Sequence, residues 1–109
     1  MIYGVEVSEQ ADSDLREIFE YIAFELQSPE IASRQLNRLE KHILSLDTMP
    51  KCYQKYEKEP WKSRGLRVLP VDNYVVLYIP DSNKKVVTIL RVMYAGRDID
   101  NHLNLHTKQ

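Results

Sequence analysis

Three short runs rich in β-branched and aromatic residues dominate the second half of the chain. They cover residues 65–71, 74–79 and 86–92, and they are joined by connections of only two and six residues. Short apolar runs bounded by turn residues are typical of strands. Because neither connection is long enough for a crossover helix, the three strands should form an antiparallel meander. Residues 64–98 therefore constrain the fold more than any other stretch.

The first 26 residues predict one strand followed by one helix. Tyr3, Val5 and Val7 alternate with the residues between them, as in a strand with one buried face. Ser8 can cap the helix that follows. Apolar residues then recur along one helical stripe, at Ala11, Leu15, Ile18, Phe19, Ile22 and Leu26.

A second helix is predicted between residues 29 and 49. Ser28 can supply an N-cap oxygen, and Pro29 suits the first helical position. Because the connection is short, the two helices should lie antiparallel and cover one face of the sheet. The apolar stripe of this helix comprises Ala32, Leu36, Leu39, Ile43 and Leu46.

The chain length of 109 residues predicts a single domain, residues 1–109. No run approaches the roughly 18 apolar residues of a membrane helix, and the N-terminus lacks the pattern of a signal peptide. We therefore expect a cytoplasmic protein. The single cysteine, Cys52, cannot form an internal disulfide, and the three histidines show no metal-ligand spacing. No metal or other cofactor is expected.

The overall formal charge of −1 conceals two oppositely charged halves. Residues 1–50 carry four basic and ten acidic side chains, whereas residues 51–97 carry ten basic and four acidic ones. Such a chain could present a basic side to an anionic partner. Alternatively, the halves could neutralise one another across the fold.

Residues 49–63 show no clean period but combine aromatic and basic side chains. Tyr53, Tyr56 and Trp61 stand among four lysines. Aromatic residues between basic ones can bind a nucleic-acid strand. They can equally anchor a loop to the sheet, and we favour this second interpretation.

The alternation within the meander divides its side chains between two faces. We expect the uncharged face to pack on the helices. The other face should be open and positive, with Arg67, Arg91 and one or both of Tyr74 and Tyr78.

Arg91 is the most informative single residue, because a charge at the end of an apolar strand needs a partner or an anion. It could bind an anionic ligand at the open face. It could instead form an internal ion pair with an acidic group such as Asp98 or Glu6.

An ordered set of motifs resembles the RelE/ParE superfamily of bacterial toxins. The motifs are SEQADSDL (8–15), SPEIA (28–32), LDTMP (46–50), RGLRVLPVDNYVVLY (64–78) and ILRVMYAGRD (89–98). The resemblance covers nearly the whole chain. It implies an α+β fold in which an N-terminal strand and an antiparallel helical hairpin pack with a mostly antiparallel sheet of about four strands, followed by a short C-terminal helix.

The resemblance also implies a biological role. The chain would be the toxin of a type II toxin-antitoxin system, which arrests growth until a cognate antitoxin neutralises it in a hetero-oligomeric complex. The C-terminal segment of the antitoxin would wrap around the toxin, lying across an exposed sheet or in a helix groove.

Two chemistries occur in this superfamily. RelE-like members cleave messenger RNA on the ribosome and need a general base, a general acid and a cation at the scissile phosphate. ParE-like members inhibit DNA gyrase and need no hydrolytic groups. Where RelE-like chains carry an arginine after the strand tyrosine, this chain has Val75, and where some carry a histidine, it has Met93. The resemblance therefore favours the ParE-like branch.

Two alternatives remain: a RelE-like endonuclease, and an inactive toxin fold that only binds a partner. For the endonuclease, the catalytic candidates are Arg67, Arg91, Tyr94 and Arg97. The candidates for binding the target or the antitoxin are Lys58, Lys62, Arg64, Arg67, Tyr74, Tyr78, Arg91, Tyr94 and Arg97.

Overall fold

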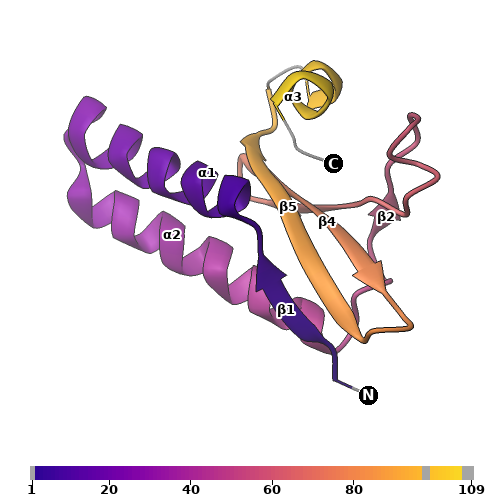
Figure 1. Ribbon diagram of the computed structural model, residues 1–109. Helices are drawn as coiled ribbons and strands as arrows, with labels where there is room; N and C mark the ends of the chain where they lie inside the picture. Colours follow the sequence, from indigo (N-terminus) through magenta and orange to yellow (C-terminus); the bar gives the residue numbers. More distant parts are fainter. Residues whose placement is uncertain (1, 97–98, 107–109) are drawn as a thin grey trace.

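The computed structural model describes residues 2–96 and 99–106, and its elements follow an α+β order (Figure 1). In chain order they are β1 (Gly4–Val7), α1 (Glu9–Glu20), the π-helical turn η1 (Tyr21–Glu25), α2 (Pro29–Leu44), the 3-10 turn η2 (Ser45–Asp47), β2 (Gln54–Lys55), β3 (Arg67–Val71), β4 (Tyr74–Asp81), β5 (Val86–Tyr94) and α3 (Ile99–His106). This order confirms the predicted fold class, including the short C-terminal helix.

The sheet has five strands in the order β1-β5-β4-β3-β2. Strands β3, β4 and β5 form the predicted antiparallel meander, and β1 joins β5 in parallel. The additional strand is β2, which pairs only two residues with β3. A strand of two residues offers no alternation to detect in a sequence, so the prediction of about four strands missed it.

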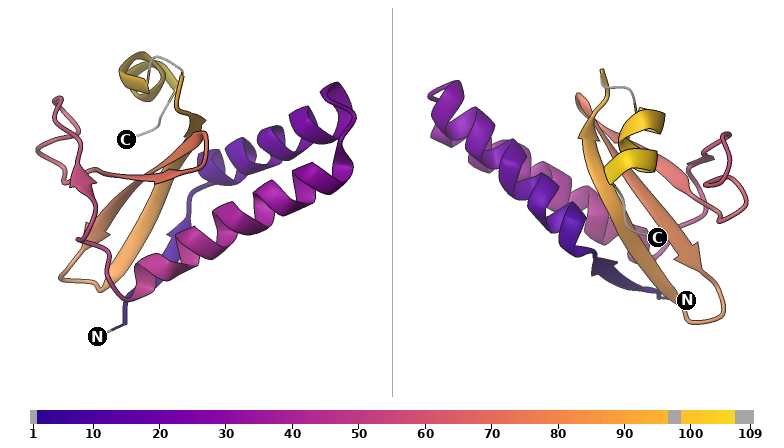
Figure 2. Two further views of the ribbon diagram at one scale, coloured as in Figure 1. Left: turned by 180° about the vertical axis from the view of Figure 1, so that it is seen from behind. Right: turned by 45° about the horizontal axis from the view of Figure 1, so that its top comes forward.

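The two helices form the predicted antiparallel hairpin against one face of the sheet (Figures 1 and 2). Ser8 begins α1 as predicted: its Oγ accepts a hydrogen bond from the Ala11 N–H at 3.0 Å and donates one to the Leu90 carbonyl at 3.0 Å. The side chain of Ser8 thus both caps the helix and joins it to β5.

The start of α2 differs in part from the prediction. Pro29 is its first residue, as expected. The Ser28 hydroxyl, however, donates to the Leu26 carbonyl at 3.1 Å and does not cap α2. The hydroxyl serves the preceding turn instead, where the backbone passes through the left-handed region at Gln27 (φ 53°).

Each face of the sheet carries an apolar core of its own. On one face, strand residues such as Val76, Tyr78 and Ile89 pack with the helical hairpin. On the other face, residues 56–66, which we call the arm, and α3 cover the sheet. The residues of this second core are Trp61, Leu66, Val75, Leu77, Met93 and Leu103, with Tyr56, Val68, Ile79, Leu90 and Ile99 packed against them.

The prediction of which face contacts the helices was wrong. The face with Tyr74 and Tyr78 packs on the hairpin, and the face with Val75 and Leu77 packs under the arm and α3. Neither face is the open, positive surface that we expected. Both faces are apolar over most of their length, so alternation alone could not assign one of them to the helices.

A bulge in β5 is one reason for the difference. Tyr78 pairs with Ile89, but the preceding residue Leu77 pairs with Arg91, so Leu90 is the extra residue. A bulge interrupts the two-residue alternation of a strand. As a result Ile89 and Val92 both join the core under the hairpin, although uninterrupted alternation places residues three apart on opposite faces.

No helix in the described part of the chain is long and apolar enough to cross a membrane.

Candidate functional site

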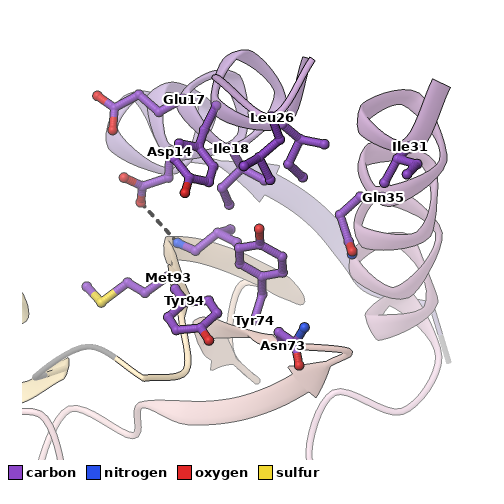
Figure 3. A pocket seen from close by; sticks show the side chains of 13 residues that line it. Asp14, Glu17, Ile18, Leu26, Ile31, Gln35, Asn73, Tyr74, Met93 and Tyr94 are labelled. Carbon is purple, nitrogen blue, oxygen red and sulfur yellow. Dashed lines mark hydrogen bonds between the residues drawn. The ribbon is translucent and has the colours of Figure 1, made fainter. Parts of the chain in front are cut away.

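A groove opens where the far half of the helical hairpin passes the end of the sheet (Figure 3). Strand β1 ends at Val7, opposite Ile89, so the last residues of β5 have no strand on that side. The groove has a volume of about 770 Å³. It is lined by Asp14, Glu17, Ile18, Tyr21, Ile22, Leu26, Ile31, Gln35, Asn73, Tyr74, Val92, Met93 and Tyr94.

Large apolar side chains line this groove and are open to solvent. The exposed fractions are 55% for Tyr21, 54% for Leu26, 52% for Ile31 and 51% for Tyr94. Phe24, in the same π-helical turn as Tyr21, is exposed as well. Apolar residues gathered in a concave site, as these four are, are typical of a surface that binds a partner.

Three tyrosines from different elements meet in the groove. The rings of Tyr74 and Tyr94 lie 6.0 Å apart in an edge-to-face arrangement with an interplanar angle of 78°. Burial raises the pKa of the Tyr74 hydroxyl, and the nearby hydroxyls of Tyr21 and Tyr94 raise it further. The hydroxyls of Tyr21 and Tyr94 are therefore close enough to influence that of Tyr74.

The wall that α1 contributes is acidic. Asp14 Oδ2 accepts hydrogen bonds from Arg91 Nε at 2.7 Å and from the Val92 N–H at 3.0 Å, while Asp14 Oδ1 accepts one from Arg91 Nη2 at 2.9 Å. The hydrogen bonds to Asp14 raise the pKa of Arg91, burial opposes this, and the charges of Asp14 and Glu17 raise it further. This bidentate pair joins α1 to β5 at the groove.

The structure thus distributes the predicted site residues over several places. Tyr74 and Tyr94 line the groove. Arg91 is buried and forms an ion pair with Asp14, a partner that the sequence analysis did not name, whereas Asp98, one of the two partners that it did name, lies outside the described residues. Arg97 lies outside the described residues.

Two further candidates hold the segment before β3 in place. Tyr78 is fully buried, and its hydroxyl donates to the Pro50 carbonyl at 2.6 Å. Arg67 Nη1 donates to the carbonyl oxygens of Lys51 at 3.1 Å and Tyr53 at 2.7 Å. We expected Arg67, with one or both of Tyr74 and Tyr78, on an open positive face. This is wrong for Arg67 and Tyr78, because their polar groups bind backbone carbonyls.

The remaining candidates, Lys58, Lys62 and Arg64, are exposed on the arm. The Arg64 guanidinium lies 5.1 Å from the ring centroid of Trp61, whose side chain is only 1% exposed. Trp61 therefore anchors the arm to the sheet, as the favoured interpretation of residues 49–63 predicted.

The two positions that distinguish RelE-like chemistry lie in the second core. Val75 is 8% exposed and Met93 is 3% exposed, and both pack with Trp61 and Leu103. These positions contribute apolar packing beneath the arm and α3. Among the described residues, no group of three or more histidine, cysteine or acidic side chains could hold a metal ion.

Sequence reasoning did not identify the helical side of the groove. In the sequence, Asp14 and Glu17 resemble the acidic residues of any solvent-exposed helix face, and Tyr21 lies off the apolar stripe of the first helix. Leu26 was the one detectable sign of this surface in the sequence: it continues the apolar stripe of the helix, but its side chain is 54% exposed. The convergence of the ends of α1, β4 and β5 is visible only in three dimensions.

Comparisons with known proteins agree with this fold. Residues 5–99 match the family described as the ParE toxin of the type II toxin-antitoxin system parDE. No curated protein sequence matches the chain significantly.

Three solved structures show the same architecture at low sequence identity. The chromosomal ParDE system from P. aeruginosa aligns with a TM-score of 0.71 and 18% identity, over 85% of this chain and 96% of that one. The RelBE2 toxin-antitoxin complex from Mycobacterium tuberculosis gives a TM-score of 0.66 and 21% identity, over 86% and 92% of the two chains. A mutant of the E. coli toxin RelE in the free state gives 0.65 and 18%, over 91% and 90%.

At these identities the solved structures establish the fold, while the family match covers nearly the whole length of the chain. The family match shows that this chain belongs to the ParE toxin family of type II toxin-antitoxin systems, and the helical hairpin, the parallel β1-β5 pair and the antiparallel meander agree with it.

Proposed function

We propose that this chain arrests growth in the cytoplasm by inhibiting DNA gyrase, and that a cognate antitoxin neutralises it by placing a segment in the groove. The gyrase assignment rests on the burial of Val75 and Met93. A RelE-like site needs charged or titratable groups that reach RNA, and these two positions instead supply apolar side chains to a closed core.

The groove supports the second part of the proposal. It exposes large apolar side chains from η1 and the residue after it, from α2 and from β5, as a surface does when a partner covers it. Antitoxin segments in this family are expected to be extended or helical, and both shapes can be received between a helical hairpin and the end of a sheet. The solved relatives include toxin-antitoxin complexes, so an antitoxin partner is consistent with the fold.

Two purified assays test the target. The chain is added to a gyrase supercoiling reaction and, separately, to a translation reaction in which transcript cleavage is followed. We expect inhibition of supercoiling and intact transcripts. Ribosome-dependent cleavage would overturn the gyrase proposal in favour of the RelE-like alternative. Inactivity in both assays, with no growth arrest on induction, would favour the inactive binding protein.

A pair of matched variants tests the groove. Ile31→Arg places a charged side chain among the exposed apolar residues of the groove, whereas Leu44→Arg makes the same change on an exposed site of α2 outside it. We expect Ile31→Arg to remain toxic but to lose neutralisation by the product of the neighbouring reading frame, with binding weakened by about 2 kcal/mol or more. Leu44→Arg should be neutralised normally. Equal neutralisation of both variants would exclude the groove as the antitoxin site.

A further inference from the structure

The acidic wall and the tyrosines of the groove lie together, although they come from different elements. Figure 3 shows Asp14 and Glu17 next to each other on α1, with Tyr74 and Tyr94 rising from the strands below. All four side chains line the same groove. A ligand in the groove would therefore meet carboxylates and aromatic rings at once.

The two carboxylates are not equivalent. Asp14 already accepts three hydrogen bonds, two from Arg91 and one from the Val92 N–H. Glu17 is exposed and, within the described part of the chain, forms no hydrogen bond or salt bridge. The charge of Glu17 acts on Arg91 at a distance and helps to raise its pKa, but of the two carboxylates Glu17 is the one whose oxygens can pair with an incoming cation.

Other side chains of the groove, Gln35 on α2 and Tyr94 on β5, also favour a cation with several N–H donors. No lysine, arginine or histidine is among the described residues that line the groove. The Gln35 amide donates its Nε2 hydrogen to Asp72 Oδ2 at 3.1 Å, which leaves its oxygen as an acceptor. Tyr94 presents about half of its surface to solvent beside the ring of Tyr74.

From this arrangement we infer that the groove contains an arginine subsite, in which a guanidinium of the bound antitoxin segment stacks on Tyr94 and pairs with Glu17. A guanidinium is planar, stacks on aromatic rings and forms bidentate hydrogen bonds with a carboxylate. An ammonium group lacks the flat face and is more strongly hydrated, so lysine fits less well. The identity of the segment rests on the proposed antitoxin partner, but the subsite can be tested without it.

The test uses small probes and the complete chain. N-acetyl-arginine amide, its lysine counterpart and its citrulline counterpart are titrated separately, and binding is followed by NMR chemical shifts. Citrulline has the shape of arginine without the charge. We expect shifts at Glu17, Tyr74 and Tyr94, with arginine binding about fivefold tighter than lysine and about tenfold tighter than citrulline.

Two variants and one control locate the site. Glu17→Gln should weaken arginine binding about fivefold and leave citrulline binding unchanged, because only the charge is removed. Tyr94→Leu should weaken it about threefold through loss of stacking. Glu25→Gln removes an exposed charge outside the groove lining and should have no effect.

Three results would overturn the inference. If the citrulline probe bound as tightly as the arginine probe, charge would play no part in recognition. If the lysine probe bound as tightly, the site would have no preference for a guanidinium. An effect of Glu25→Gln equal to that of Glu17→Gln would show general electrostatic attraction and no defined subsite. None of these results depends on gyrase inhibition or on neutralisation, so they separate the subsite from the proposed function.

Discussion

The two faces of the sheet are both apolar, but they are covered in different ways. On one face the arm and α3 close over Val75, Leu77 and Met93, with Trp61 fully inserted between them. On the other face the helical hairpin covers the middle of the sheet and then leaves it, so that a groove opens at the ends of β4 and β5. The closed face thus stabilises the fold, and the open end of the other face is available to a partner.

Under the proposed function, this difference separates the groove that binds the antitoxin from the positions where a RelE-like chain would need catalytic groups. This chain has apolar residues, Val75 and Met93, at the two positions where a RelE-like chain would carry catalytic groups, and both residues belong to the second core. The groove does not depend on these residues being charged. The capacity to bind an antitoxin can therefore persist when the capacity for RNA cleavage is absent, which is the arrangement that we propose for this chain.

The largest expected effect comes from opening the closed face. Trp61→Ala should lower the free energy of unfolding by about 3–5 kcal/mol, because it removes a large, fully buried side chain. Tyr21→Ala, on the exposed groove side, should cost about 1 kcal/mol or less. Urea denaturation of both variants measures the contrast. Similar losses would show that the groove face contributes as much to folding as the closed face.

The next effect concerns the ion pair at the boundary between hairpin and sheet. Asp14→Ala should cost about 3 kcal/mol, because it leaves the nearly buried Arg91 without this carboxylate and removes the acceptor of the Val92 N–H. Asp12→Ala is the control on the same helix, since its pair with Arg16 is largely exposed and should contribute about 0.5 kcal/mol or less. Equal losses would mean that burial of the Asp14 pair has no energetic consequence.

A smaller effect is expected at the hydroxyl of Tyr78 beneath the hairpin. Tyr78→Phe removes the hydrogen bond to the Pro50 carbonyl and should cost about 1 kcal/mol at neutral pH. Tyr21→Phe, at an exposed site in the groove, should change the free energy of unfolding by less than about 0.5 kcal/mol.

The same variant changes the dependence of stability on pH. Burial raises the pKa of Tyr78, the charge of Arg67 opposes this, and smaller contributions from Cys52 and Tyr53 raise the pKa further. The folded state therefore holds this proton more tightly than the unfolded state, where the pKa is about 10. The contribution of the hydroxyl is complete below pH about 10 and is lost as the pH rises above it. Denaturation between pH 8 and 11 should show a shallower decline for Tyr78→Phe than for the parent; identical slopes would contradict this.

The order of the elements was predictable because it rests on local signals. The two-residue connection at Asp72-Asn73 and the β-branched runs beside it defined the meander, and Ser8 marked the start of α1. The assignment of faces was not predictable from the same pattern. A turn fixes which residues pair, but when both faces are apolar it does not tell which one the helices cover.

The candidate site was predicted only in part for a related reason. Tyr74 and Tyr94 stand near strand ends, where exposed aromatic residues attract attention. Glu17 and Tyr21 come from α1 and η1, far from β5 in the sequence, and neither departs from the pattern of a solvated helix face. Arg91 was recognised as needing a partner, yet the bulge at Leu90 and the partner Asp14 required the fold itself.

The smallest effect on folding is expected at the outer side of the arm. Lys55, just before the arm, and Lys58 and Lys62 within it are exposed, so replacing all three with Gln should change the free energy of unfolding by less than about 0.5 kcal/mol. Gyrase acts on DNA, and exposed lysines near the bound duplex would attract its phosphates. The triple variant should therefore need a several-fold higher concentration to inhibit supercoiling, and this difference should shrink as salt is raised.

The matched control is the triple variant Arg34→Gln, Lys41→Gln and Lys84→Gln, which removes the same charge from exposed sites on α2 and on the β4-β5 turn. If both triple variants lose inhibition equally, only net charge matters and the arm has no special role. If only the arm variant loses it, while neutralisation through the groove is unchanged, the two covers of the sheet have separate functions. The closed face would then present its outer side to the target, and the open face would receive the antitoxin.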